Sequence, residues 1–206
     1  MPASSVNATP TIVYLHGFRS SPASVKARQL VDAVAALPAH VRPVLHVPML
    51  AAGPVQDVSA TLAWIDANVA RPQARLTLVG SSLGGFYATH IAERTGARAV
   101  LVNPAIRPYD DLRPYIGPQV NLYTGETFVV TEVHFEELRA MAVDRITRPD
   151  RYWLMVQSGD EQLDYREAVA FYAGAFQLVE GGGDHGFQRF DAQIAPLLRF
   201  AGVAAG

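Results

Sequence analysis

The sequence contains no cysteine and a single lysine, Lys26. Without cysteine, the chain can form no disulfide, no catalytic thiolate and no cysteine-based zinc or iron–sulfur site. Lys26 is the one residue that could form a Schiff base, and it lies in no motif that indicates such chemistry. These two scarcities exclude several classes of enzyme before any motif is considered.

Charged residues and long apolar runs are also scarce. Charged residues make up 17% of the chain and the formal net charge is −2, so no basic excess favours nucleic acid or an anionic membrane as a partner. The N-terminal stretch MPASSVNATP lacks the basic and apolar regions of a signal peptide. No run of about 18 apolar residues occurs, so no membrane span is expected. We expect a soluble, cytoplasmic protein.

Apolar residues, by contrast, make up 50% of the 206 residues, which argues against disorder and allows one domain with a substantial core. Short apolar runs predict six strands, at residues 11–15, 43–47, 75–79, 98–102, 151–157 and 175–179. Segments with apolar residues at helical spacing alternate with them, at residues 24–37, 54–69, 83–94, 165–173 and 187–200. This alternation predicts the α/β class, with a mostly parallel six-stranded sheet flanked by helices. Binding sites in such sheets lie at the carboxyl ends of the strands.

Residues 103–150 interrupt the alternation. They contain five prolines, scattered tyrosines and two short helix-like pieces, one of them at residues 132–141. A segment of this length between two strands is typical of a lid or binding loop. We therefore expect a single domain over residues 1–206, with a cap insertion at about residues 104–150.

The stretch GSSLG at residues 80–84 fits the pattern G-x-S-x-G, with Ser82 at its centre, between a predicted strand and a predicted helix. In so tight a turn the central residue has a strained backbone, and its neighbours two positions away must be small. Ser81 has no glycine two places before it, so the register selects Ser82. A glycine-rich packing turn would give the same letters, but the flanking strand and helix favour an exposed nucleophile.

A serine hydroxyl needs a base that removes its proton. The chain order in this chemistry is serine, acid, histidine, and only His134 and His185 follow Ser82 outside the helix that begins at the serine. His134 lies in the predicted cap helix, where we expect a solvated side chain. His185 lies in VEGGGDHGF, a glycine-rich turn directly after the sixth strand, and is the predicted base. The alternative is that His185 only caps the last helix.

The third group must be a carboxylate that orients the imidazole. Asp160, the first carboxylate after the fifth strand, is the predicted acid. Its competitors are Glu161 and Asp164, and Asp164 could instead be the N-cap of the following helix. Asp184 is expected to form a turn beside the histidine.

Two backbone N–H groups are expected to hold the developing oxyanion. One belongs to Leu83 at the start of the helix, and the other to Phe18 in the loop HGFRS after the first strand. Gly17 permits a close approach of this loop, and His16 is expected to hold it by hydrogen bonds. Arg19 is either a solvated surface charge or a contact for an acidic group of the substrate.

Several motifs in the right order carry a family resemblance: HGF with a serine-rich turn, GSSLGG, VNPA, SGDEQLDY and GGGDHGF. From about residue 12 to residue 200 the chain resembles the YqiA-like esterases of bacteria, an uncharacterised-protein family of small α/β-hydrolases. The resemblance implies an α/β-hydrolase fold, a Ser82–Asp160–His185 triad and hydrolysis of carboxylic esters or acyl thioesters, with no metal or organic cofactor. Asn103 of the VNPA motif is expected in a pocket wall, hydrogen-bonded to loop backbone, so that Gly17, Arg19 and Asn103 are the predicted substrate-binding residues.

Two alternatives stay open at the level of the sequence. A non-catalytic α/β module could keep the fold and bind a small ligand or another protein. A serine hydrolase with the same core could act on a peptide or carbon–carbon bond, because the fold does not determine the substrate. A nucleotide-binding role is excluded, because GSSLGG lacks the spacing G-x-G-x-x-G and no Walker lysine follows it.

Overall fold

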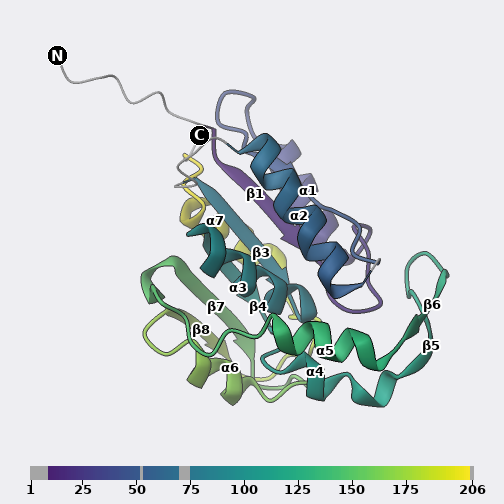
Figure 1. The fold of residues 1–206 in the computed structure, drawn as a ribbon. Coiled ribbons are helices and arrows are strands. Elements are labelled where there is room, and N and C mark those ends of the chain that lie inside the picture. The colour runs from purple at the N-terminus through teal and green to yellow at the C-terminus, as the bar shows by residue number, and fades with distance from the viewer. Residues whose placement is uncertain (1–8, 52, 70–74, 205–206) are drawn as a thin grey trace.

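A computed structural model describes residues 9–51, 53–69 and 75–204 of the protein (Figure 1). Its centre is a six-stranded parallel sheet in the order β2-β1-β3-β4-β7-β8. The strands are β1 (Thr11–Leu15), β2 (Val44–His46), β3 (Leu76–Ser81), β4 (Arg98–Val102), β7 (Tyr152–Gln157) and β8 (Phe176–Glu180). The six predicted strands and the α/β class are therefore confirmed, with strand ends shifted by at most two residues.

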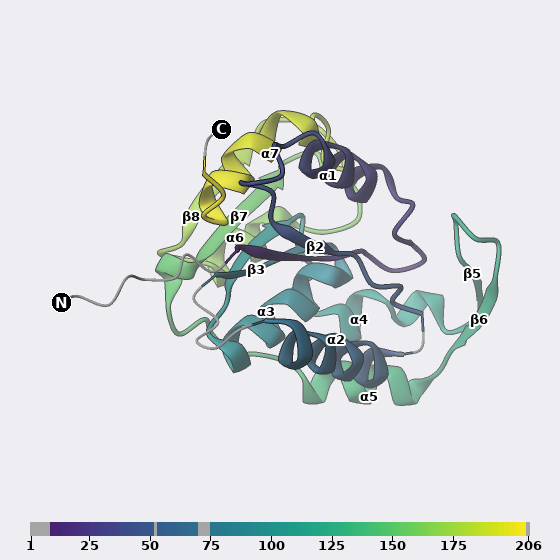
Figure 2. The same cartoon turned by 90° about the horizontal axis from the view of Figure 1, so that it is seen from above.

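Helices cover both faces of this sheet (Figure 2). One face is covered by α1 (Val25–Ala35) and α7 (Phe190–Phe200), and the other by α2 (Pro54–Asn68), α3 (Leu83–Thr95) and α6 (Tyr165–Phe171). No helix in the described part of the chain is long and apolar enough to cross a membrane.

The central strands are apolar on both faces because each face packs on a helical layer. In β1, Ile12 and Tyr14 belong to the core under α1 and α7, whereas Val13 and Leu15 belong to the core on the opposite side. This alternation follows from the two-residue period of a strand. It explains why the strands appear in the sequence as continuous apolar runs rather than as alternating patterns.

The last helix begins later than predicted. The sequence places it at residues 187–200, but α7 starts at Phe190. Phe187 and Arg189 have φ values of 59° and 60°, a left-handed backbone that a right-handed helix does not include. These residues instead close the loop that carries His185.

A small antiparallel hairpin is the feature that the sequence does not predict. It joins β5 (Gly117–Val120) to β6 (Thr127–Val130) and extends away from the body of the molecule (Figures 1 and 2). The hairpin lies in the segment between β4 and β7, which also contains α4 (Pro108–Asp111), the 3₁₀ helix η1 (Arg113–Tyr115), α5 (Glu132–Ala140) and the 3₁₀ helix η2 (Pro149–Arg151). The helix expected at residues 132–141 is thus present as α5.

Candidate active site

The residues singled out in the sequence gather at the carboxyl edge of the sheet. Each follows a different strand: Gly17 follows β1, Ser82 β3, Asn103 β4, Asp160 β7 and His185 β8. Parallel strands bring their carboxyl ends to one edge, so residues up to 168 positions apart in the chain become neighbours.

Ser82 lies in a sharp turn between β3 and α3, with φ 55° and ψ −122°. A Cβ atom on Gly80 would lie 2.3 Å from the carbonyl oxygen of Gly84, and one on Gly84 would lie 2.0 Å from the carbonyl oxygen of Leu15. Neither position has room for a side chain, so the glycine spacing of the motif has a direct steric cause. The turn holds the Ser82 hydroxyl at the N-terminus of α3 in a conformation that a non-glycine residue adopts only under strain.

His185 bridges the hydroxyl of Ser82 and the carboxylate of Asp160. Its Nε2 lies 3.0 Å from Ser82 Oγ, and its Nδ1 lies 2.9 Å and 3.0 Å from the two carboxylate oxygens of Asp160. An ionised carboxylate only accepts hydrogen bonds, so Nδ1 carries the hydrogen and Nε2 is left as an acceptor for the serine proton.

Asp160 is held as an anion under the imidazole, with its side chain only 2% exposed. Burial by itself raises the pKa of this carboxyl group. The hydrogen bond and the charge of His185, with the backbone N–H groups of Gln162 and Leu163 at 2.9 Å and 3.0 Å, outweigh burial and lower the pKa below its ordinary value.

The competing carboxylates have other partners. Asp164 caps α6 by accepting from the N–H of Arg166 at 3.0 Å. Glu161 accepts the backbone N–H of His185 at 3.0 Å, and the carbonyl of Asp184 accepts the N–H of Phe187 in a turn.

His134 also lies apart from Ser82. Its Nδ1 accepts the backbone N–H of Thr131 at 2.9 Å, so it caps α5, and the residue lines a cavity. This partly buried position differs from the solvated one that the sequence predicts, and a capping role explains why a histidine occupies the third position of the helix.

The loop after β1 lies directly against Ser82. A Cβ atom on Gly17 would stand 3.1 Å from Ser82 Cβ and 3.6 Å from Ser82 Oγ, so a glycine allows the backbone to come close. Phe18 follows Gly17 in this loop, and Leu83 is the first residue of α3, where backbone N–H groups have no acceptor within the helix. His16 supports the loop: its Nε2 accepts the N–H of Leu50 at 3.1 Å, its Nδ1 lies 3.0 Å from the carbonyl oxygen of Gly17, and burial lowers its pKa.

The hairpin holds the other side of the same loop. Arg19 Nε donates to the carbonyl of Val120 at 2.9 Å, and the carbonyl of Arg19 accepts the N–H of Leu122 at 2.8 Å. Asn121 Nδ2 donates to the carbonyl of Ser20 at 2.7 Å. Sequence reasoning did not identify Asn121, because its partner lies 101 positions away in the chain.

Asn103 lies beneath the loop that carries His185, with 2% of its surface exposed. Its Nδ2 donates to the carbonyls of Asp184 and His185 at 3.0 Å and 3.1 Å, and its Oδ1 accepts the N–H of Gln157 at 3.0 Å. Asn103 therefore hydrogen-bonds loop backbone, whereas neither of the cavities beside Ser82 includes it in its lining.

Gln157 supports the same loop and was also missed. Its Oε1 accepts the N–H of Gln188 at 2.8 Å, and its Nε2 donates to the carbonyl of Gln188 at 2.9 Å. The signal in the sequence is a polar residue at the end of the apolar run YWLMVQ, and in the structure this residue is only 2% exposed.

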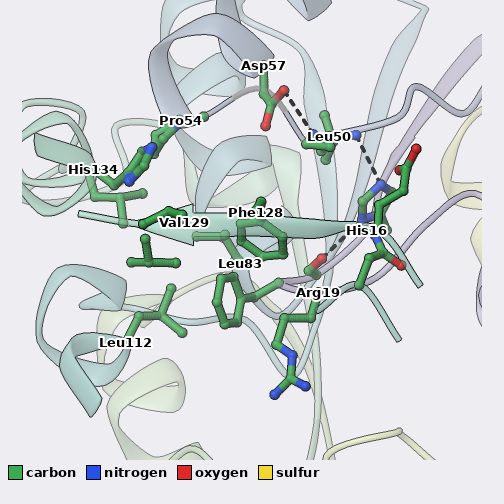
Figure 3. Close-up of a pocket in the computed structure, with 18 of the residues that line it drawn as sticks. His16, Arg19, Leu50, Pro54, Asp57, Leu83, Leu112, Phe128, Val129 and His134 are labelled. Carbon is green, nitrogen blue, oxygen red and sulfur yellow. Dashed lines mark hydrogen bonds between the residues drawn. The ribbon is translucent and has the colours of Figure 1, made fainter. Parts of the chain in front are cut away.

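Two cavities lie on either side of the loop formed by Gly17, Phe18 and Arg19. The large cavity, of about 700 Å³, is lined by apolar side chains of the cap, α2 and α3, among them Leu83, Leu112 and Phe128 (Figure 3). The serine cavity, of about 360 Å³, is lined by Ser82 and His185. Gly17, Phe18, Arg19 and Leu112 line both cavities, so the two spaces adjoin at this loop, and Ser82 lines the smaller one. In the described ranges, no group of three or more His, Asp or Glu side chains is placed to hold a metal ion.

Comparisons with known proteins give a family and a fold. The profile of the family described as "Uncharacterised protein family (UPF0227)" matches residues 11–202. The esterase domain of a Rhodothermus marinus protein is 17% identical, with a TM-score of 0.69 over 95% of this chain and 88% of that one. Alpha/beta hydrolase domain-containing protein 10 from mouse is 17% identical, with a TM-score of 0.65 over 93% and 87%. Est1E from Butyrivibrio proteoclasticus, with ferulic acid bound, is 14% identical, with a TM-score of 0.64 over 97% and 91%. At these identities the likeness establishes the α/β-hydrolase fold, as the sequence predicts.

Proposed function

The chain belongs to the uncharacterised protein family UPF0227, and from that premise we propose that it is a serine hydrolase of carboxylic esters or acyl thioesters. The observation that carries the proposal is the contact of 3.0 Å between Ser82 Oγ and His185 Nε2, with Asp160 on the other ring nitrogen. Structural similarity to proteins described as esterases supports the same class of reaction. Residues 104–150 act as a cap within a single domain in this proposal.

The proposed reaction begins with attack by Ser82 Oγ on the carbonyl carbon of the substrate. His185 Nε2 takes the hydroxyl proton, and the negative charge of Asp160 stabilises the resulting imidazolium. The backbone N–H groups of Phe18 and Leu83 hold the carbonyl oxygen as it becomes negative.

Collapse of this tetrahedral intermediate releases the alcohol or thiol, which takes the proton from His185 Nε2. The acyl group is then bonded to Ser82 Oγ. A water molecule attacks the acyl carbon while His185 again removes a proton, and the carboxylic acid leaves with Ser82 regenerated. Gly17 and Arg19 contact the substrate in this proposal, whereas Asn103 acts through the loop that carries His185.

The apolar lining of the large cavity fits a non-polar half of the substrate, because burial of such a group removes apolar surface from water. The apolar side chains in this lining include Leu50, Leu83, Leu112, Phe128, Phe135 and Leu138, and the carboxylates of Asp57 and Glu126 lie at the same cavity.

The test is the substitution Ser82→Ala, assayed with para-nitrophenyl butyrate and with a fluorophosphonate probe that labels activated serines. We expect loss of turnover and of labelling with an unchanged melting curve, because only one oxygen atom is removed. Ser59→Ala, on an exposed position of α2, is the matched control and should keep both. Turnover by Ser82→Ala at the wild-type rate would refute the proposal. A wild-type protein that binds esters but is not labelled would instead support a non-catalytic module.

A further inference from the structure

Lys26, the one lysine in the chain, lies in the first turn of α1 and lines the serine cavity together with Ser82 and His185. Its Nζ donates to the carbonyl oxygen of Gly186 at 2.6 Å, one residue after the histidine. An ammonium group has three hydrogens to donate. Among the described hydrogen bonds, Lys26 Nζ uses one of them, so two are available to a ligand in the cavity.

The lining of the serine cavity is positively charged. It includes Lys26 and Arg19, and none of the described residues that line it is an aspartate or glutamate. Apart from Ser82 and His185, the other polar side chains of the lining are tyrosines, serines and an amide: Tyr14, Ser20, Ser24, Ser81, Tyr115, Tyr123 and Gln162. A cavity with two cations and no carboxylate in its wall favours a negatively charged occupant.

Nearby carboxylates keep Lys26 protonated without occupying the cavity. Burial lowers the pKa of Lys26 to about 8, and the charges of Asp184 and Asp160 oppose that decrease. The amine is therefore still mostly protonated at neutral pH. Asp160 lies beneath the imidazole with its side chain 2% exposed, and neither carboxylate belongs to the cavity lining.

Arg19 supplies a second positive group beside the serine. Its Nε donates to the carbonyl of Val120, and among the described hydrogen bonds its two terminal nitrogens are uncommitted. Figure 3 shows its guanidinium pointing away from the other labelled side chains of the large cavity. Because Arg19 also lines the serine cavity, its charge adds to that of Lys26 there.

We propose that Lys26 and Arg19 form a carboxylate-binding subsite, and that the substrate is an ester or thioester with a carboxylate on the half that occupies the serine cavity. The inference rests on the proposed hydrolase function. The two cavities share the wall formed by Gly17, Phe18, Arg19 and Leu112, and Gly17 lies against Ser82, so in this proposal the two halves of an ester lie in separate spaces. The apolar half lies in the large cavity and the anionic half in the serine cavity.

The experiment uses two pairs of esters. In the first pair the charge is on the leaving group: meta-acetoxybenzoate is compared with its methyl ester. In the second pair the charge is on the acyl group: para-nitrophenyl hexanoate is compared with its ω-carboxyl derivative. For each protein, kcat/KM for the anionic ester is divided by kcat/KM for its neutral partner. The ratio cancels any general loss of activity, which matters because Lys26 also contacts the loop that carries His185.

We expect Lys26→Met to lower this ratio about tenfold or more in one of the two pairs. This is the effect expected when a hydrogen bond between the ammonium group and the substrate carboxylate is lost. The affected pair identifies the half of the substrate that enters the serine cavity. Lys26→Arg should keep most of the ratio, because it keeps the charge. Arg28→Met removes a unit of charge from an exposed position of the same helix and should leave the ratio at its wild-type value.

Equal ratios in the wild type and Lys26→Met for both pairs would overturn the subsite. If the wild type hydrolyses none of the four esters, the hydrolase function itself fails, whereas hydrolysis of an anionic ester alone would support the subsite. If Lys26→Met is inactive on all four esters, binding replaces turnover as the measurement. The Kd of meta-hydroxybenzoate for Ser82→Ala should then rise about tenfold in Ser82→Ala/Lys26→Met, and an unchanged Kd would refute the proposal.

Discussion

Asn103 offers the sharpest test of how the protein positions His185. Replacement by alanine removes the two hydrogen bonds to the carbonyls of Asp184 and His185, and it leaves the buried N–H of Gln157 without its acceptor. The residue also has a φ of 41°, a left-handed conformation that asparagine tolerates better than alanine. Asn103→Ala should therefore affect both the fold and the catalytic loop.

The expected loss of stability follows from these contacts. An orphaned buried N–H costs about 1–3 kcal/mol, and each lost hydrogen bond to a carbonyl about 0.5–1.5 kcal/mol. The left-handed backbone adds about 1 kcal/mol for alanine. The sum is about 3–7 kcal/mol, a large part of the roughly 5–15 kcal/mol that stabilises a typical domain. Asn103→Gly loses the same hydrogen bonds without the steric strain and should be about 1 kcal/mol more stable than Asn103→Ala.

Urea denaturation of the wild type and both variants measures these differences, and hydrolysis of para-nitrophenyl butyrate measures the effect on the loop. We expect kcat to fall more than KM rises in the variants that fold, since Asn103 does not line either cavity beside the serine. Stability of Asn103→Ala within about 0.5 kcal/mol of the wild type would refute the reasoning. A change confined to KM would instead support a direct contact with substrate.

Two further predictions concern Asp160. Asp160→Asn should lower kcat by about 10⁴-fold, because the amide cannot hold the imidazole in the same tautomer or stabilise its positive charge. The control is Asp164→Asn, which alters the cap of α6 and the ion pair with Arg166, and a large loss of kcat there would reassign the acid. The pKa of Asp160 is lowered below its ordinary value of 3.8, so its contribution to folding stability is fully present above that value and is lost as pH falls through the lower, folded-state pKa. Acid unfolding followed by circular dichroism should therefore depend less on pH in Asp160→Asn than in the wild type below about pH 4, and identical pH profiles would contradict the assignment.

The sequence predicts the sheet well because each central strand is buried between two helical layers. A strand that is buried on both faces requires a short run of apolar residues, as in TIVYL and RAVLV, and such runs can be recognised in the sequence alone. The expected position of Ser82 likewise rests on a local steric rule, since Gly80 and Gly84 leave no room for a side chain.

The parts that the sequence does not predict depend on contacts between distant segments. Asn121 and Gln157 hold loops through hydrogen bonds to backbone 101 and 31 positions away, and no local pattern marks such contacts. The sequence does not predict the hairpin, because its strands have only four residues each and one of them contains Pro118, which is unfavourable in a strand. The start of α7 is misplaced because left-handed backbone at Phe187 and Arg189 has no glycine to signal it.

The attachment of the hairpin to the loop after β1 limits how this protein could be redesigned. Val120 and Leu122 bind the side chain and the backbone of Arg19, and Asn121 binds the carbonyl of Ser20, immediately after the N–H of Phe18. Exchanging the cap for that of a relative would therefore change more than the shape of the substrate space, because it would release one of the proposed oxyanion donors from its support. A chimera that aims at a new specificity has to transplant the hairpin and this loop together.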